Sequence, residues 1–76
     1  MKLTEEQIDV MKEDLCADII EIIMHEWHFD MTKAMDMFYN SDTFQRMQDS
    51  ETGLYYQSPG YVYDFFCNEI RLGKVE

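Results

Sequence analysis

The first 28 residues carry apolar side chains at the spacing of a helix that buries one face. Thr4 and Gln7 have the spacing of a capping box, and neither glycine nor proline interrupts the chain before Phe29. The pattern therefore predicts one long helix that begins after Thr4 and ends at Trp27 or His28. At about 100° per residue, the residues on its apolar face are Ile8, Met11, Leu15, Ile19, Ile22 and Ile23.

The second half of this predicted helix is apolar over more than one stripe. Ile20, Met24 and Trp27 lie beside the main apolar face and widen it. A helix of this kind is either central to its fold or contacts a second surface. We therefore expect either a central position or a homodimer interface formed by Ile20, Met24 and Trp27.

Three shorter helices are predicted downstream, each after a capping residue. Asp30 is expected to cap a helix that ends at residues 40–41, and Ser41 a helix over residues 42–48. Ser58 followed by proline predicts a last helix over residues 59–72, which Gly73 ends. The residues expected to face inward on the two middle helices are Met31, Ala34, Met35, Met37, Phe38, Phe44 and Met47.

Residues 54–56 are expected to be extended and to pack back on the core. Together the elements predict an all-α fold, a compact bundle of three or four helices with a short extended aromatic loop before the last helix. The chain is expected to form a single helical domain over residues 1–76. Because the connections are short, neighbouring helices should pack roughly antiparallel.

The charge of the chain narrows the classes of partner. Sixteen acidic and six basic residues give a formal net charge of −10 among 76 residues. Nucleic acids and anionic membrane surfaces attract basic proteins, so we expect neither as a partner. A basic protein partner, or simple solubility, fits this charge.

Cysteine usage and the start of the chain bear on its location. Cys16 and Cys67 both fall in predicted helices and form no CxxC pair, which excludes a zinc ribbon or a disulfide framework. The chain starts with acidic residues, without an apolar signal segment, and no apolar run approaches the ~18 residues of a membrane span. We expect a cytoplasmic protein.

The most organised polar feature lies on the first helix, and we call it the acidic stripe. Spacings of 4, 3, 4 and 3 residues place it opposite the isoleucine face. Like charges at this spacing are slightly unfavourable, which favours contact with a basic partner. An alternative is a metal-binding protein or metal-dependent hydrolase that uses Glu21, His25 and His28. The acidic stripe consists of Asp14, Asp18, Glu21, His25 and His28.

Four of the five tyrosines fall within residues 52–63, so aromatic side chains are concentrated before the last helix. Exposed aromatic residues often dominate protein interfaces, and we expect Tyr55, Tyr56 and Tyr61 to contact a partner. Glu69 falls among apolar residues of the last helix, where it must be paired, reach solvent or have a raised pKa. The simplest interpretation is a position near the helix end, where the core thins.

The sequence contains no complete set of catalytic parts. The two histidines have no nucleophile at a spacing that the sequence can relate to them, and the three glycines stand apart from one another. We therefore expect no enzymatic activity and no cofactor.

Two segments carry a resemblance to a known family. Residues 39–44, YNSDTF, and residues 52–63, TGLYYQSPGYVY, precede a terminal helix that contains Glu69. This arrangement resembles a family of short uncharacterised bacterial proteins, whose genes often lie near toxin-like genes similar to ADP-ribosyltransferases. The resemblance spans about residues 19–70 and implies an antitoxin-like or accessory protein that acts by contact.

The leading hypothesis is therefore a non-enzymatic acidic module that binds a basic protein partner. The acidic stripe or the tyrosines would form its contact surface. A nucleic-acid mimic that blocks a DNA-binding protein shares the acidic surface and stays open as a third hypothesis.

Overall fold

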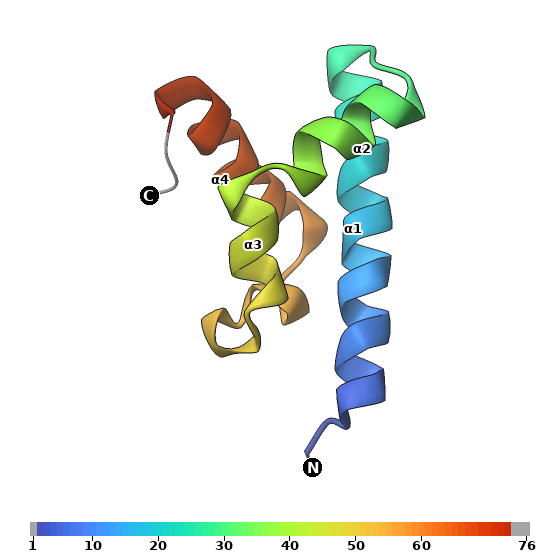
Figure 1. Ribbon diagram of the computed structural model, residues 1–76, viewed down its shortest axis with the longest axis vertical. Helices are drawn as coiled ribbons and strands as arrows, with labels where there is room; N and C mark the ends of the chain where they lie inside the picture. Colours follow the sequence, from blue (N-terminus) through green and yellow to red (C-terminus); the bar gives the residue numbers. More distant parts are fainter. Residues whose placement is uncertain (1, 74–76) are drawn as a thin grey trace.

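The structure of the protein is a computed structural model that describes residues 2–73. All regular elements in this part of the chain are helical, which confirms the predicted all-α fold (Figure 1). The elements are α1 (Glu5–Trp27), α2 (Met31–Tyr39), α3 (Asp42–Gln48), the 3₁₀ turns η1 (Ser50–Thr52) and η2 (Leu54–Tyr56), and α4 (Pro59–Leu72).

The helix boundaries follow the predicted caps. Thr4 and Gln7 form a capping box, in which Gln7 N–H donates to Thr4 Oγ1 at 3.1 Å and Thr4 N–H donates to Gln7 Oε1 at 2.9 Å. Asp30, Ser41 and Ser58 each accept a hydrogen bond from the backbone N–H three residues ahead. Side chains that satisfy the free amides of a helix start fix that start locally. This explains why the sequence predicts these boundaries well.

The segment before α4 differs from the prediction, because residues 54–56 form a 3₁₀ turn and not an extended strand. Gly53 enters this turn with φ at 73°, and a Cβ atom there would lie 2.7 Å from the Tyr56 hydroxyl oxygen. The Thr52 hydroxyl donates toward the carbonyl oxygens of Arg46 and Asp49, at 2.6 and 2.8 Å. Leu54, in the second of these two tight turns, is buried in the core, as predicted for this segment.

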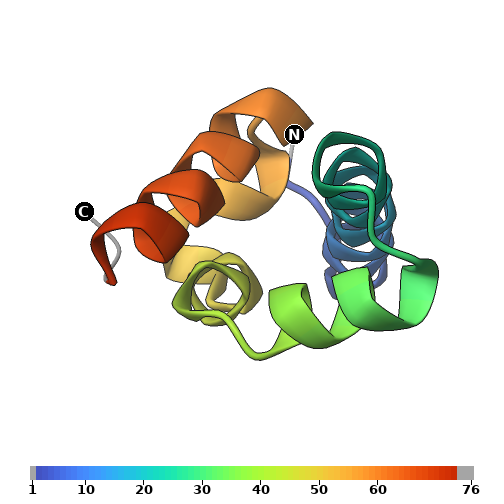
Figure 2. The same ribbon diagram turned by 90° about the horizontal axis from the view of Figure 1, so that it is seen from above.

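The helices surround the core at different inclinations and are not all antiparallel (Figures 1 and 2). Figure 2 shows α1 and α3 almost end-on, with α2 lying across between them. This crossing places Phe38 of α2 against Phe66 of α4, with ring centroids 5.8 Å apart. Packing therefore overrides the direction that the short connections favour.

The core is built around aromatic and branched side chains. Phe38 is wholly buried and has edge-to-face contacts with Phe44 and Phe66. The predicted apolar face of α1 lies inward, with Leu15, Ile19 and Ile23 buried and Ile8, Met11 and Ile22 half-buried. Of the residues expected inward on α2, Met31 is an exception, because it is 58% exposed.

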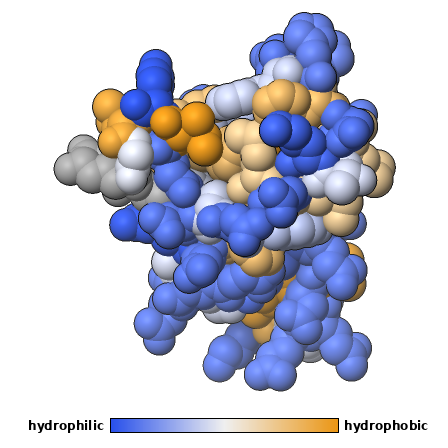
Figure 3. All heavy atoms as spheres, turned by 45° about the horizontal axis from the view of Figure 1, so that its top comes forward, coloured by the Kyte–Doolittle hydropathy of each residue, from blue (hydrophilic) through white to orange (hydrophobic). Residues whose placement is uncertain are grey.

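The outer surface is strongly polar. The space-filling view in Figure 3 shows hydrophilic residues over most of the visible face, with hydrophobic residues at several places between them. None of the helices within residues 2–73 combines the length and the apolar character needed to cross a membrane.

Candidate partner-binding groove

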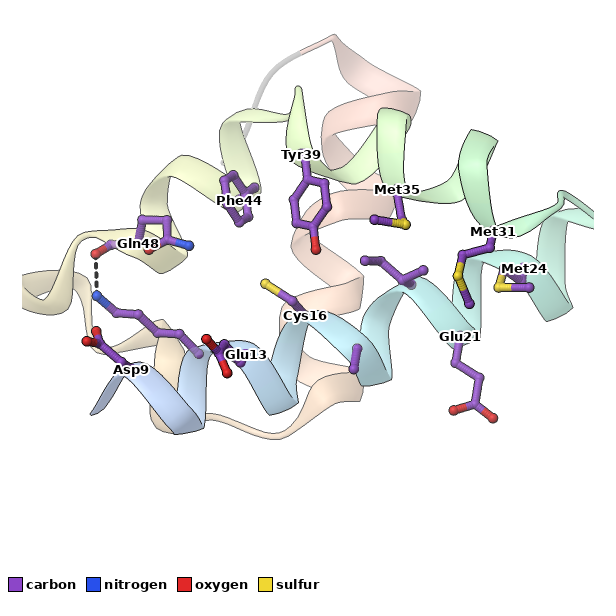
Figure 4. A pocket seen from close by; sticks show the side chains of 13 residues that line it. Asp9, Glu13, Cys16, Glu21, Met24, Met31, Met35, Tyr39, Phe44 and Gln48 are labelled. Atoms are coloured by element: carbon purple, nitrogen blue, oxygen red, sulfur yellow. Dashed lines mark hydrogen bonds between the residues drawn. The ribbon is translucent and has the colours of Figure 1, made fainter. Parts of the chain in front are cut away.

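The main hollow of the described chain runs along α1, on the side that faces α2 and α3 (Figure 4). It has a volume of about 740 Å³, and we call it the methionine groove. Its α1 wall consists of Asp9, Lys12, Glu13, Cys16, Ala17, Ile20, Glu21 and Met24, and its opposite wall consists of Met31, Met35, Tyr39, Phe44 and Gln48.

The methionine groove has two chemically different halves. Toward the C-terminal end of α1 it is mainly apolar, because Met24 lies near Met31 and Met35 of α2 and the Glu21 carboxylate points away (Figure 4). Toward the N-terminal end it carries the carboxylates of Asp9 and Glu13. Methionine side chains adapt to apolar surfaces of different shape, so the apolar half suits a partner more than a single rigid ligand.

Lys12 closes the acidic end. Its ammonium group donates a hydrogen bond to the Gln48 carbonyl oxygen at 2.6 Å (dashed line in Figure 4). It donates another to Ser50 Oγ at 3.1 Å. It also lies 5.9 Å from the centre of the Tyr55 ring. The negative end of the α3 dipole stabilises a cation in this position. Lys12 thus connects α1 to the C-terminal end of α3 across the methionine groove.

Cys16 lies in the floor of the methionine groove. Burial, and then the negative charge of Glu13, raise the pKa of the Cys16 thiol from 9.0 to about 11. Because the thiolate is the reactive form of cysteine, this thiol is poorly reactive near neutral pH.

The rate of Cys16 alkylation should therefore reach its plateau at a higher pH than the rate of an ordinary thiol. In a Cys67→Ser variant, the rate of iodoacetamide modification should rise about tenfold per pH unit and keep rising beyond pH 9. The same chain in denaturant should level off near 9, since an unfolded thiol has an ordinary pKa. Glu13→Gln should accelerate the folded-state reaction. Mass spectrometry follows the rate, and a plateau of the folded protein near pH 9 would contradict the assigned pKa direction.

The acidic stripe lies beside the methionine groove on α1. Asp14, Asp18, Glu21 and His25 are exposed, as predicted. Glu21 belongs to both features, and its carboxylate points away from the groove in Figure 4. His28 leaves the helical register, because it adopts a left-handed conformation with φ at 57° as the C-cap of α1.

The metal hypothesis receives no support from geometry. His28 is the C-cap of α1 in a left-handed conformation, and the His25 ring lies 3.9 Å from Glu26 at the exposed surface. Within residues 2–73, no group of three or more His, Cys, Asp or Glu side chains is placed to hold a metal ion.

The predicted tyrosines lie apart from the methionine groove lining. Tyr55 is half-buried beside Lys12 and packs edge-to-face on Tyr56, which is 60% exposed. Tyr61 is 50% exposed and contacts Phe65 on α4. They flank different parts of the surface, so the structure does not join them with the acidic stripe into one site.

The residues expected at a homodimer interface are largely engaged within the chain. Ile20 is buried below the methionine groove, and Trp27 donates a hydrogen bond from Nε1 to the Tyr63 hydroxyl at 2.8 Å. Trp27 also packs against Phe29 and Phe66. Ile20 and Met24 line the methionine groove and Trp27 does not, so the wide apolar arc of α1 reflects its central position. The homodimer stays a prediction.

Glu69 has a partner that the sequence did not reveal. Its carboxylate accepts hydrogen bonds from Asp42 N–H at 2.8 Å, Thr43 N–H at 2.9 Å and the Thr43 hydroxyl at 2.8 Å. A side chain of α4 thus caps the N-terminus of α3. The carboxylate neutralises amides that have no partner within the helix and lies at the positive end of its dipole. Of the possibilities that the sequence left open, the carboxylate is paired, and Glu69 also lies near the end of α4, as expected.

The opposite wall of the methionine groove contains Met31, Met35 and Phe44, which the sequence predicted as inward-facing but did not assign to a binding surface. Met31, Met35 and Tyr39 follow one another at intervals of four residues, which places them on one side of α2 beside the buried Ala34 and Phe38. This four-residue spacing of apolar side chains indicates a second apolar side on the helix, next to its buried face.

Comparisons with protein-family models, with curated proteins and with solved structures find no match to this chain.

Proposed function

We propose that this protein is a non-enzymatic interaction module that binds a basic protein partner through the methionine groove. The observation that carries the proposal is an apolar, methionine-lined groove bordered by carboxylates on a chain of net charge −10. Apolar contacts would supply affinity, and the surrounding negative charge would select and attract a positive partner.

Two features support a contact role over catalysis. The lining of the methionine groove contains no histidine, and its one thiol, that of Cys16, has a pKa raised to about 11. A nucleophile is usually activated by a nearby base or a lowered pKa. The resemblance of residues 39–44 and 52–63 to bacterial proteins encoded near toxin-like genes adds an antitoxin-like or accessory role to the proposal.

A charge-matched pair of variants tests this site. Ala17 is exposed in the methionine groove wall, so Ala17→Arg places a bulky cation in the groove without disturbing the core. Gln45 is exposed on α3 outside the groove lining, so Gln45→Arg adds the same charge elsewhere. A partner captured from native lysate by the wild-type protein should be basic. It should bind Ala17→Arg at least about tenfold more weakly, a loss of ~1.4 kcal/mol.

The control should retain the partner within about twofold, since a rim charge far from the contact has little effect on affinity. Equal loss with both variants would show that net charge alone drives capture. Full retention by Ala17→Arg would place the partner outside the methionine groove and overturn the proposal.

A further inference from the structure

We infer that the occupant of the methionine groove is a single amphipathic helix with apolar side chains along one face and Lys or Arg residues toward one end. This inference rests on the proposed function and specifies the chemistry of the partner segment. It follows from the length of the groove, from its lining and from the uneven distribution of its charge.

The open length of the methionine groove matches a helix of about three turns. Lys12 bridges the walls at one end, and the α1 wall beyond it extends from Glu13 to Met24, which at 1.5 Å per residue corresponds to about 17 Å. A helix of about 11 residues has the same length. Because α1 forms one wall along this whole distance, and α2 and α3 form the other, a helix laid between them would contact three helices at once (Figure 4).

The lining matches one face of such a helix. Met24, Met31 and Met35 offer flexible apolar contacts, and Tyr39 and Phe44 add aromatic surface in the middle (Figure 4). Peptide helices bind grooves of this kind through apolar side chains spaced three and four residues apart. Methionine-rich walls accept different side-chain shapes in these positions.

The charge distribution gives the helix a polarity. Asp9 and Glu13 lie in one half of the methionine groove together with Lys12, whereas the half around Met24 and Met31 has one carboxylate, Glu21, which points away from the groove (Figure 4). Basic residues of the bound helix should therefore gather at the end that faces Asp9 and Glu13. Lys12 is already held by Gln48 and Ser50, so it does not neutralise these carboxylates by a direct hydrogen bond.

The same charges argue against two other occupants. A fatty acid would bring its carboxylate toward Asp9 and Glu13 or leave it in the apolar half. A second copy of this chain would bring another net charge of −10 against the same acidic border. Like charges brought together at an interface are unfavourable and suppress association.

Designed peptides provide the test. We suggest a small set of capped 16-residue helices with Leu, Met or Phe at the apolar positions and three lysines near one end. A scrambled peptide of identical composition keeps the charge but removes the helical periodicity, and a third version carries the lysines at the opposite end. Fluorescence anisotropy measures affinity, and protection of Cys16 from alkylation in the Cys67→Ser protein shows whether the groove is filled.

At least one amphipathic peptide should bind and slow Cys16 alkylation at least fivefold. The scrambled peptide should bind at least tenfold more weakly, and one placement of the lysines should be preferred. Ala17→Arg should remove the protection, whereas Gln45→Arg should retain it.

Equal binding of scrambled and amphipathic peptides would overturn the inference, as would Cys16 protection by dodecanol or dodecanoate but by none of the peptides.

Failure of the inference can be told from failure of the proposed function. If no peptide protects Cys16 while Ala17→Arg still abolishes capture of a basic protein, the groove binds a protein surface that is not a helix. If Ala17→Arg changes neither the protection of Cys16 by the peptides nor the capture of a basic protein, the proposed function itself is wrong.

Discussion

Replacing Phe38 with alanine should lower the free energy of unfolding by about 3–5 kcal/mol. Phe38 is wholly buried and contacts Phe44 and Phe66 from neighbouring helices. The truncation removes both aromatic contacts and leaves a cavity where α2, α3 and α4 meet. A chain of 76 residues has a total stability on the order of 4–11 kcal/mol, so much of it would be lost. Urea unfolding followed by circular dichroism measures the change.

Tyr61→Ala is the matched control for this truncation. Tyr61 is an aromatic residue of α4 that is 50% exposed, and it contacts only Phe65 among the aromatic rings described above. Its removal should cost under about 1 kcal/mol. A Phe38→Ala variant no less stable than Tyr61→Ala would show that the aromatic cluster is not the centre of the core.

Replacing Glu69 with alanine should cost about 2–4 kcal/mol of unfolding free energy, the second largest effect that we expect. The carboxylate accepts three hydrogen bonds from Asp42 and Thr43, and hydrogen bonds to charged groups contribute about 1.5–3 kcal/mol each without being additive. The Thr43 hydroxyl is wholly buried, so it would be left without this acceptor. Urea unfolding again gives the magnitude.

Asp64→Ala serves as the control, because Asp64 is an exposed carboxylate on the same helix. It should change stability by no more than about 0.5 kcal/mol. Glu69→Gln should recover only part of the loss, since a carboxamide offers one acceptor oxygen in place of two. If Glu69→Ala and Asp64→Ala have equal effects, the link between α4 and the start of α3 does not contribute to stability.

The helix boundaries could be predicted because their causes are local. Thr4, Asp30, Ser41 and Ser58 cap amides three residues away, so each signal lies within a few residues of its effect. The turn at residues 54–56 could not be predicted in this way. Its conformation depends on burial of Leu54 in a core built from distant segments. The direction of α2 depends in the same way on the contact between Phe38 and Phe66.

The candidate site was predicted only in part. The acidic stripe is exposed as its spacing indicated, because polar residues opposite a buried face must reach solvent. The methionine groove requires the relative placement of α1, α2 and α3, which no pattern within one helix specifies. Glu69 illustrates the same limit, since its partners lie 26 and 27 residues away in the sequence. The sequence marked it as unusual but could not identify what it binds.

The position of Leu15 as the first buried residue of α1 has a consequence for how this protein moves. The turns of α1 before Leu15 are held only by half-buried side chains and by the hydrogen bonds of Lys12 to Gln48 and Ser50. They should therefore open and close locally while the rest of the fold stays intact. Backbone amides there should exchange with deuterated solvent well before those near Ile19 and Ile23. A ligand that lies along Asp9 and Glu13 would reduce this local opening. The entropic cost of ordering the N-terminal turns of α1 would then lower the affinity of the ligand.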